Sequence, residues 1–255
     1  MDPFFAELID NGIFQVMSLR VSRDEWASKV PLYCMAVKTR SSTTPREPEN
    51  AGNTWKLTRW SLHSLVQNEI DRNFQCSEDV RCGPRLSACH YLRACITESL
   101  RLSPPVGGLM AREVLAGGLE VDGYLFPKGV ETETPHYALH YDEKYYLEPL
   151  LYKPERWLGD EEPEVAKARS VFCAFSIGPR GCVRKIMAYQ ELMIVIGRVL
   201  CDFEIKLDDR SELQERSERW KGCRQRADEY QLYDTFSSKS MGPRVRFRPR
   251  RRAEL

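Results

Sequence analysis

Three stretches of the chain place apolar residues at helical spacing, and they predict its main helices. They are residues 57–74, 85–102 and 185–200. In the first stretch, for example, Val66, Ile70 and Phe74 recur every fourth position, which puts all three on one helix face. Pro104 and Pro105 follow the second stretch and end that helix, because proline cannot continue the backbone hydrogen-bond pattern.

A strand-rich section lies between the second and third helices. The pair Asp122-Gly123 stands between alternating apolar residues over positions 119–126, which is typical of a β-hairpin with a tight turn. Residues 130–134 predict a further strand. The pattern then predicts a short helix over 135–140 and an irregular meander, rich in aromatics and prolines, over 141–158.

Apolar alternation returns after the third helix. Phe203, Ile205 and Leu207 predict one strand, and Val245 with Phe247 predicts another. Together these patterns predict a mainly α fold with a minor antiparallel β-sheet, which the hairpin and the C-terminal strands would form.

Polar stretches divide the chain into three parts. Residues 41–54 are polar and rich in proline and glycine, as linkers are, and residues 208–228 are so highly charged that they favour a solvated insertion. The expected parts are an N-terminal segment with its linker over 1–54, a main region over 55–249 and a basic tail over 250–255. The six arginines near the C-terminus could bind nucleic acid, but no aromatic platform accompanies them, so a solvated tail is favoured.

The composition fits a globular chain in a reducing compartment. Hydrophobic residues make up 42% of the 255 residues and the formal net charge is +1, which indicates no nucleic acid or other general electrostatic partner. The nine cysteines include no CxxC pair, so neither a zinc site nor a disulfide framework is indicated. No signal peptide, membrane anchor or transmembrane helix is visible. An intracellular location is expected, in the cytoplasm or at the endoplasmic reticulum.

Cys182 is the main candidate for chemistry. It ends the loop Phe175-Ser-Ile-Gly-Pro-Arg-Gly181 and directly precedes the third helix, whose unpaired N–H groups favour a thiolate. A single cysteine thiolate is one of the few protein ligands that hold haem iron. Arg180 offers a fork for a carboxylate such as a haem propionate, and Gly178 permits a tight turn and a close approach to a flat ligand. The alternative is a buried, inert cysteine after an ordinary loop.

The whole phrase resembles the haem-thiolate loop of the cytochrome P450 monooxygenases. Phe175, Gly178, Arg180 and Cys182 occupy four of the five fixed positions of that motif. Residues from about 62 to 249 resemble the C-terminal half of the cytochrome P450 fold, in a form similar to filamentous-fungal members that act in secondary metabolism. The resemblance implies a truncated version of that fold.

A second motif involves two charged residues on the second helix. Glu98 and Arg101 are three positions apart and share one helix face, where such a pair is commonly a surface ion pair worth about 0.2–0.5 kcal/mol. Arg156 follows in Pro154-Glu-Arg-Trp157, in the chain order of a three-residue cluster that locks the segment before the thiolate loop in the family. The resemblance therefore implies that Glu98, Arg101 and Arg156 form a hydrogen-bonded cluster, which can be buried at tolerable cost.

The resemblance also implies roles for single residues. Cys182 would be the axial ligand of the iron of haem b, Arg180 and Arg112 would bind the propionates, and Phe175 would shield the sulfur. Residues 106–110 would line the substrate side. The implied function is a haem-thiolate monooxygenase that inserts oxygen into a hydrophobic small molecule, with an NADPH-dependent reductase as partner and natural-product biosynthesis as the setting. For Arg112, an ordinary surface arginine is the alternative.

Two departures from the family pattern favour an alternative function. No acid–alcohol pair for proton delivery is identifiable upstream, so no catalytic residue is assigned. Arg184 replaces the family's glycine at the fifth motif position, and its long cationic side chain at a helix start predicts weakened or altered haem binding. The alternative is a non-catalytic, degenerate cytochrome P450 remnant with weak or no haem binding.

A pair of histidines raises the question of a metal site. His136 and His140 are four positions apart, as metal ligands on a helix would be. No third ligand stands at matching spacing, so packing in a helix or placement at the surface is expected instead.

Overall fold

The structure, a computed structural model, describes six stretches of the chain. They are residues 54–106, 110–159, 162–207, 232–233, 239–240 and 245–250. Several expectations lie outside these residues. They concern the N-terminal segment and linker before residue 54, residues 107–109 of the expected substrate side, the charged insertion over 208–228 and residues 251–255 of the tail.

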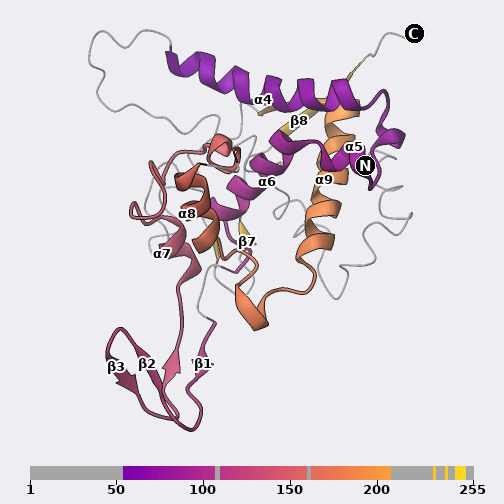
Figure 1. The fold of residues 1–255 in the computed structure, drawn as a ribbon. Helices are drawn as coiled ribbons and strands as arrows, with labels where there is room; N and C mark the ends of the chain where they lie inside the picture. Colours follow the sequence, from indigo (N-terminus) through magenta and orange to yellow (C-terminus); the bar gives the residue numbers. More distant parts are fainter. Residues whose placement is uncertain are drawn as a thin grey trace.

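Three long helices form the body of the described chain (Figure 1), which confirms the mainly α prediction. They are α4 (Thr54–Asn73), α6 (His90–Leu102) and α9 (Lys185–Asp202). The shorter helices are α5 (Pro84–Ser87), α7 (His136–His140) and α8 (Pro163–Val171), and three 3-10 turns are η2 (Ser77–Asp79), η3 (Pro154–Trp157) and η4 (Gly178–Arg180). The short helix predicted over 135–140 is confirmed as α7.

The second predicted helix is interrupted near Cys89, so the expectation of one helix over 85–102 was wrong. Cys89 leaves the helical conformation with φ −77° and ψ 72°, and α6 begins directly after it. Glu69 on α4 stabilises this new start, because its carboxylate accepts hydrogen bonds from the N–H groups of Tyr91 and Leu92 at 2.9 and 2.8 Å. A carboxylate at a helix N-terminus accepts hydrogen bonds from the free amides, and its negative charge interacts favourably with the positive end of the helix dipole.

The described strands form four separate two-stranded antiparallel sheets rather than one sheet. The pairs are β1 (Arg112–Glu113) with β4 (Glu131–Thr132), β2 (Leu119–Val121) with β3 (Tyr124–Phe126), β5 (Phe203–Leu207) with β8 (Val245–Pro249), and β6 (Leu232–Tyr233) with β7 (Lys239–Ser240). The predicted hairpin is confirmed, and its turn residues Asp122 and Gly123 have φ values of 49° and 83°. The two C-terminal strands are also confirmed, with Ile205 opposite Phe247.

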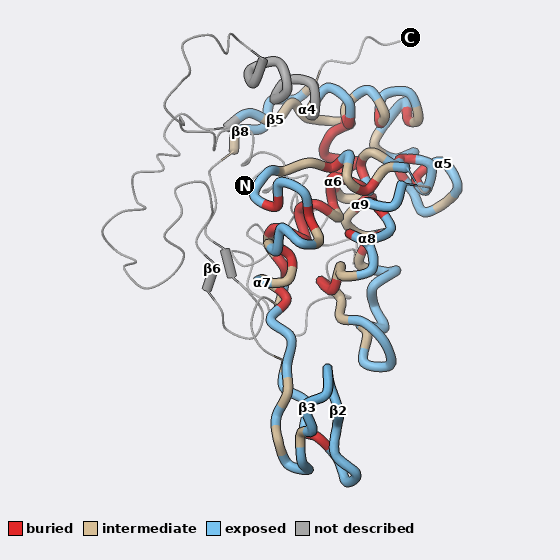
Figure 2. The backbone as a smooth tube through the Cα atoms, turned by 60° about the vertical axis from the view of Figure 1, so that its left-hand side comes forward, coloured by how far each residue is buried: buried red, intermediate tan, exposed pale blue. Residues whose placement is uncertain are grey.

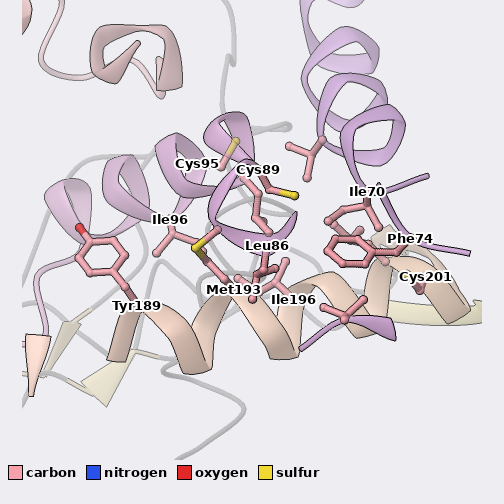
Figure 3. Packing of buried hydrophobic residues seen from close by; sticks show 14 of the residues in the cluster. Ile70, Phe74, Leu86, Cys89, Cys95, Ile96, Tyr189, Met193, Ile196 and Cys201 are labelled. Carbon is pink, nitrogen blue, oxygen red and sulfur yellow. The ribbon is translucent and has the colours of Figure 1, made fainter. Parts of the chain in front are cut away.

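The buried core lies where α4, α6 and α9 meet (Figures 2 and 3). Ile70, Ile96 and Ile196 come from these three helices in turn and are all fully buried. Gly197 on α9 lets the residue after η2 pack closely against the helix, because a Cβ atom there would stand 3.0 Å from Cγ1 of Val80. The β2–β3 hairpin, in contrast, projects away from the helices and is exposed along most of its length.

Arg250, which directly follows β8, binds two of the helices. Arg250 donates two hydrogen bonds to the carboxylate of Asp71 on α4, at 2.9 and 2.8 Å, and a third to the Leu200 carbonyl on α9 at 2.9 Å. Arg250 was expected in the solvated tail, yet it is tied to the main region. None of the described helices is long and apolar enough to cross a bilayer.

Candidate functional site

The loop that leads into α9 is closed by a backbone hydrogen bond at its two ends. The N–H of Cys182 donates to the carbonyl of Phe175 at 2.8 Å. Between these residues, Ser176 and Gly178 take positive φ values of 57° and 74°. A Cβ atom at Gly178 would meet nothing within 4 Å, so the φ value, and not crowding, favours glycine there. The space beside Gly178 is open.

Cys182 is exposed at the end of this loop, so it is not a buried cysteine. The apolar residues near it in the chain are exposed as well. Ile177 is 59% exposed, Val183 96% and Ile186 75%. The loop therefore presents an exposed thiol, and exposed apolar residues stand near it in the chain.

Phe175 fixes the start of the loop to the helices. Its ring packs against the ring of Tyr189 on α9, with centroids 5.4 Å apart. Tyr189 is buried, its hydroxyl lies 3.2 Å from the hydroxyl of Thr97 on α6, and the guanidinium of Arg93 stands 4.9 Å from its ring centroid. The predicted shielding of the Cys182 sulfur by Phe175 stays a prediction, since the observed partner of the Phe175 ring is Tyr189.

The three arginines considered for the haem site, Arg112, Arg180 and Arg184, are all exposed. Arg180 is exposed and forms no ion pair within the described residues. Arg112, on β1, donates to the carbonyls of Met110 and Ala111 at 3.1 and 2.9 Å. Arg184 is exposed at the N-cap of α9. Propionate binding by Arg180 and Arg112 therefore remains a prediction.

Glu98, Arg101 and Arg156 do meet, and they meet in the interior. Arg101 holds the Glu98 carboxylate with two hydrogen bonds, from Nε at 2.9 Å and from Nη2 at 2.8 Å. Arg156 adds a hydrogen bond from Nε at 3.1 Å. The side chains of Glu98 and Arg101 are 0% exposed, which excludes the surface ion pair considered from the spacing alone.

Two further donors complete the cluster and were missed in the sequence. The indole N–H of Trp157 donates to Glu98 at 2.9 Å, and the backbone N–H of Lys153 donates at 3.0 Å. Burial alone would raise the pKa of Glu98, but its hydrogen bonds with Arg101 and the charges of Arg101 and Arg156 outweigh burial and lower this pKa. The fully paired carboxylate explains how the charges can be buried.

His140 connects this cluster to the segment before the loop. Its Nδ1 lies 2.9 Å from the carbonyl of Arg101, and Arg101 in return donates from Nη1 to the His140 carbonyl at 2.6 Å. The N–H of Cys173 donates to His140 Nε2 at 3.1 Å. Both ring nitrogens are engaged in this way, so His140 is not half of a metal pair with His136. Among the described residues, no group of three or more candidate ligands could hold a metal ion.

The chain is similar to known proteins over most of this region. A family model described as Cytochrome P450 matches residues 61–233. Cytochrome P450 monooxygenase AKT7 from Alternaria alternata is 40% identical over 201 residues, which cover 75% of this chain and 38% of the relative. Cytochrome P450 monooxygenase apf7 from Gibberella fujikuroi is 41% identical over 196 residues, covering 74% of this chain and 36% of the relative. Apf8 from the same organism is 39% identical over 207 residues and is covered to 55%.

The helix-rich fold with small antiparallel sheets agrees with the cytochrome P450 match over residues 61–233. With the matches above, the chain belongs to the cytochrome P450 family. Membership implies a haem cofactor, and the family generally uses hydrophobic substrates and a redox partner. The chain spans from about a third to just over half of the length of these curated relatives.

Proposed function

We propose that this chain binds haem b through the thiolate of Cys182 and forms the haem-loop part of a monooxygenase. The substrate would be a hydrophobic small molecule in natural-product biosynthesis, and the electrons would come from an NADPH-dependent reductase. The observation that carries the proposal is the exposed thiol of Cys182 on a loop with exposed apolar neighbours. When bound, haem would supply the oxygen chemistry that amino-acid side chains lack.

The residues present fit a flat, largely apolar group with acidic edges. The open space beside Gly178 lets such a group approach the backbone, and Val183 and Ile186 offer apolar contacts. Arg180 is exposed and has no ion-pair partner in the described chain, so its guanidinium is available to a carboxylate. Phe175 and Tyr189 would keep the loop in place, since they dock its first residue on α9.

A spectrum of the haem-loaded chain tests this proposal. The purified chain would be titrated with haem, reduced and exposed to carbon monoxide. We expect a Soret band of the thiolate type that is lost in Cys182→Ser and retained in Cys76→Ser, a control at another exposed cysteine. If the unmodified chain takes up no haem, or if Cys182→Ser keeps the thiolate-type band, the proposal is wrong.

The alternative function is a remnant that binds haem weakly or not at all, and Arg184 is the residue that favours it. Arg184 lies exposed at the N-cap of α9, two residues after Cys182. At this position the positive end of the helix dipole repels a cation. Arg184→Gly in the same titration separates the two functions. Haem uptake by Arg184→Gly but not by the unmodified chain would establish the remnant, while full and equal haem uptake by both proteins would exclude it.

A further inference from the structure

His140 lies at the junction of the Glu98 cluster and the Cys182 loop. Its imidazole is fully buried and is stacked on the ring of Phe172, with centroids 5.4 Å apart and planes inclined by 8°. A carbonyl can only accept a hydrogen bond, so the contact of Nδ1 with the Arg101 carbonyl places the ring proton on Nδ1. Nε2 then carries a lone pair, and this lone pair accepts the N–H of Cys173.

Cys173 leads directly into the loop. Its carbonyl accepts the N–H of Ser176 at 2.8 Å, which forms the turn before Ile177. Phe175, inside that turn, accepts the N–H of Cys182 through its own carbonyl at 2.8 Å. Hydrogen bonds and the short peptide segments between them therefore connect α6, through His140 and Cys173, to Cys182.

The arrangement requires a neutral imidazole. Burial is the main cause that lowers the pKa of His140, to about 4, so the ring is neutral near neutral pH. The charged or titratable groups that face it are Arg101 and Glu98 on α6, His136 on its own helix, the buried Tyr146, whose ring centroid is 6.2 Å away, and the Cys173 thiol, whose sulfur lies 3.5 Å from Nε2. Burial raises the pKa of that thiol to about 11, so Cys173 is neutral as well.

We infer that His140 is a positioning residue for the Cys182 loop, because its Nε2 lone pair holds the N–H of Cys173 and so fixes where the loop begins. The inference rests on the proposed function for its purpose, which is to hold the thiol in one place for iron. Its physical content is separate, since the hydrogen bond exists without haem. Motif reasoning does not lead to this role, because residues 140 and 182 are far apart in the chain.

Amide hydrogen exchange of the haem-free chain, followed by mass spectrometry, tests the inference. In His140→Asn the amide nitrogen can replace Nδ1 toward Arg101, but nothing accepts the N–H of Cys173. In His140→Gln the longer amide can reach the position of Nε2 and accept it. Loss of the acceptor that the described residues offer to this buried N–H predicts exchange roughly ten- to a hundredfold faster over residues 172–183 in His140→Asn. We expect His140→Gln to restore most of the protection.

Peptides from the second half of α9 and the variant His136→Gln serve as internal controls, and neither should change. Faster exchange in His140→Asn that is confined to 172–183 supports the inference. The inference would be overturned if residues 172–183 were equally protected in His140→Asn and His140→Gln. It would also be overturned if His140→Asn lost as much protection along α9 as over residues 172–183. The result is independent of haem uptake, so failure of the proposed function and failure of this inference remain distinguishable. If the chain takes up haem, His140→Asn should also shift the carbon monoxide spectrum away from the thiolate type, and His140→Gln should not.

Discussion

Two buried ionisable residues, Glu98 and His140, keep definite charge states for opposite reasons. Glu98 stays charged because two arginines and two other N–H donors surround its carboxylate. His140 stays neutral because burial penalises its cation and Arg101 repels it. The two residues share Arg101, so the charged cluster and the neutral imidazole form one network.

The neutral state of His140 predicts a pH dependence of stability. The ordinary pKa of histidine is 6.5 and that of His140 in the folded chain is about 4. Between these values the unfolded chain takes up a proton that the folded chain does not. The contribution to stability is therefore complete above pH 6.5 and is lost as pH falls toward 4, by up to about 3 kcal/mol. Urea unfolding at several pH values measures this loss.

The comparison variant for this pH series is His140→Gln, which has no titrating group. We expect the free energy of unfolding of His140→Gln to fall less between pH 6.5 and 4.5 than that of the unmodified chain. Some slope should remain, because burial also lowers the pKa of His63. Glu98 contributes below this window, since its lowered pKa places its loss of stability at pH values under 4.5. Parallel curves for the two proteins would contradict the prediction.

At the residue scale, the sequence predicted one set of side chains that meet, the Glu98 cluster, and missed some of its other partners. The family resemblance implied that Glu98, Arg101 and Arg156 form a cluster, and the structure brings them together. The roles of Trp157 and His140 were missed. Trp157 ends the Pro154–Trp157 motif and could have been included, whereas His140 was judged only against metal-ligand spacing. His140 contacts backbone atoms of Arg101 and Cys173. Because every residue has these atoms, the sequence pattern does not predict such contacts.

At the scale of elements, local signals predicted local structure. Helical spacing found α4 and α9, and the Asp122-Gly123 turn found the hairpin. Helix α8 was missed although Pro163 at its first turn is a helix-start signal. The β1–β4 pairing and the division into separate sheets were not predicted, because strand pairing depends on contacts between distant segments.

The start of α6 gives a prediction at this scale. Glu69→Gln keeps the length of the side chain, but its amide group cannot accept both N–H groups of Tyr91 and Leu92. The loss of one charge-assisted hydrogen bond and of the favourable charge at the helix start should reduce the free energy of unfolding by about 1–2 kcal/mol. Urea unfolding measures this change. Glu78→Gln, at an exposed glutamate in η2, should cost less than about 0.5 kcal/mol, and equal costs would show that Glu69 is no cap.

At the scale of the whole molecule, α9 joins the buried core to the exposed surface beside the loop. Its C-terminal half is buried, as Ile196 and Leu200 show, whereas Ile186 and Met187 in its first turn are exposed. The helical spacing in the sequence placed Ile186, Met187 and Leu200 on one predicted apolar face. Periodicity does not tell apolar residues that pack in a core from those that a cofactor covers.

The apolar surface beside Cys182 leads to a prediction about the haem-free chain. An environment-sensitive apolar dye should bind there, because Val183 and Ile186 are among the most exposed large apolar residues described. Haem should displace the dye from this surface. Leu125, on the projecting β2–β3 hairpin, is also exposed and provides a matched control. Both Ile186→Glu and Leu125→Glu should lower total dye fluorescence, but only Ile186→Glu should remove the part that haem displaces. If Leu125→Glu removes that part instead, haem covers the hairpin and not the start of α9.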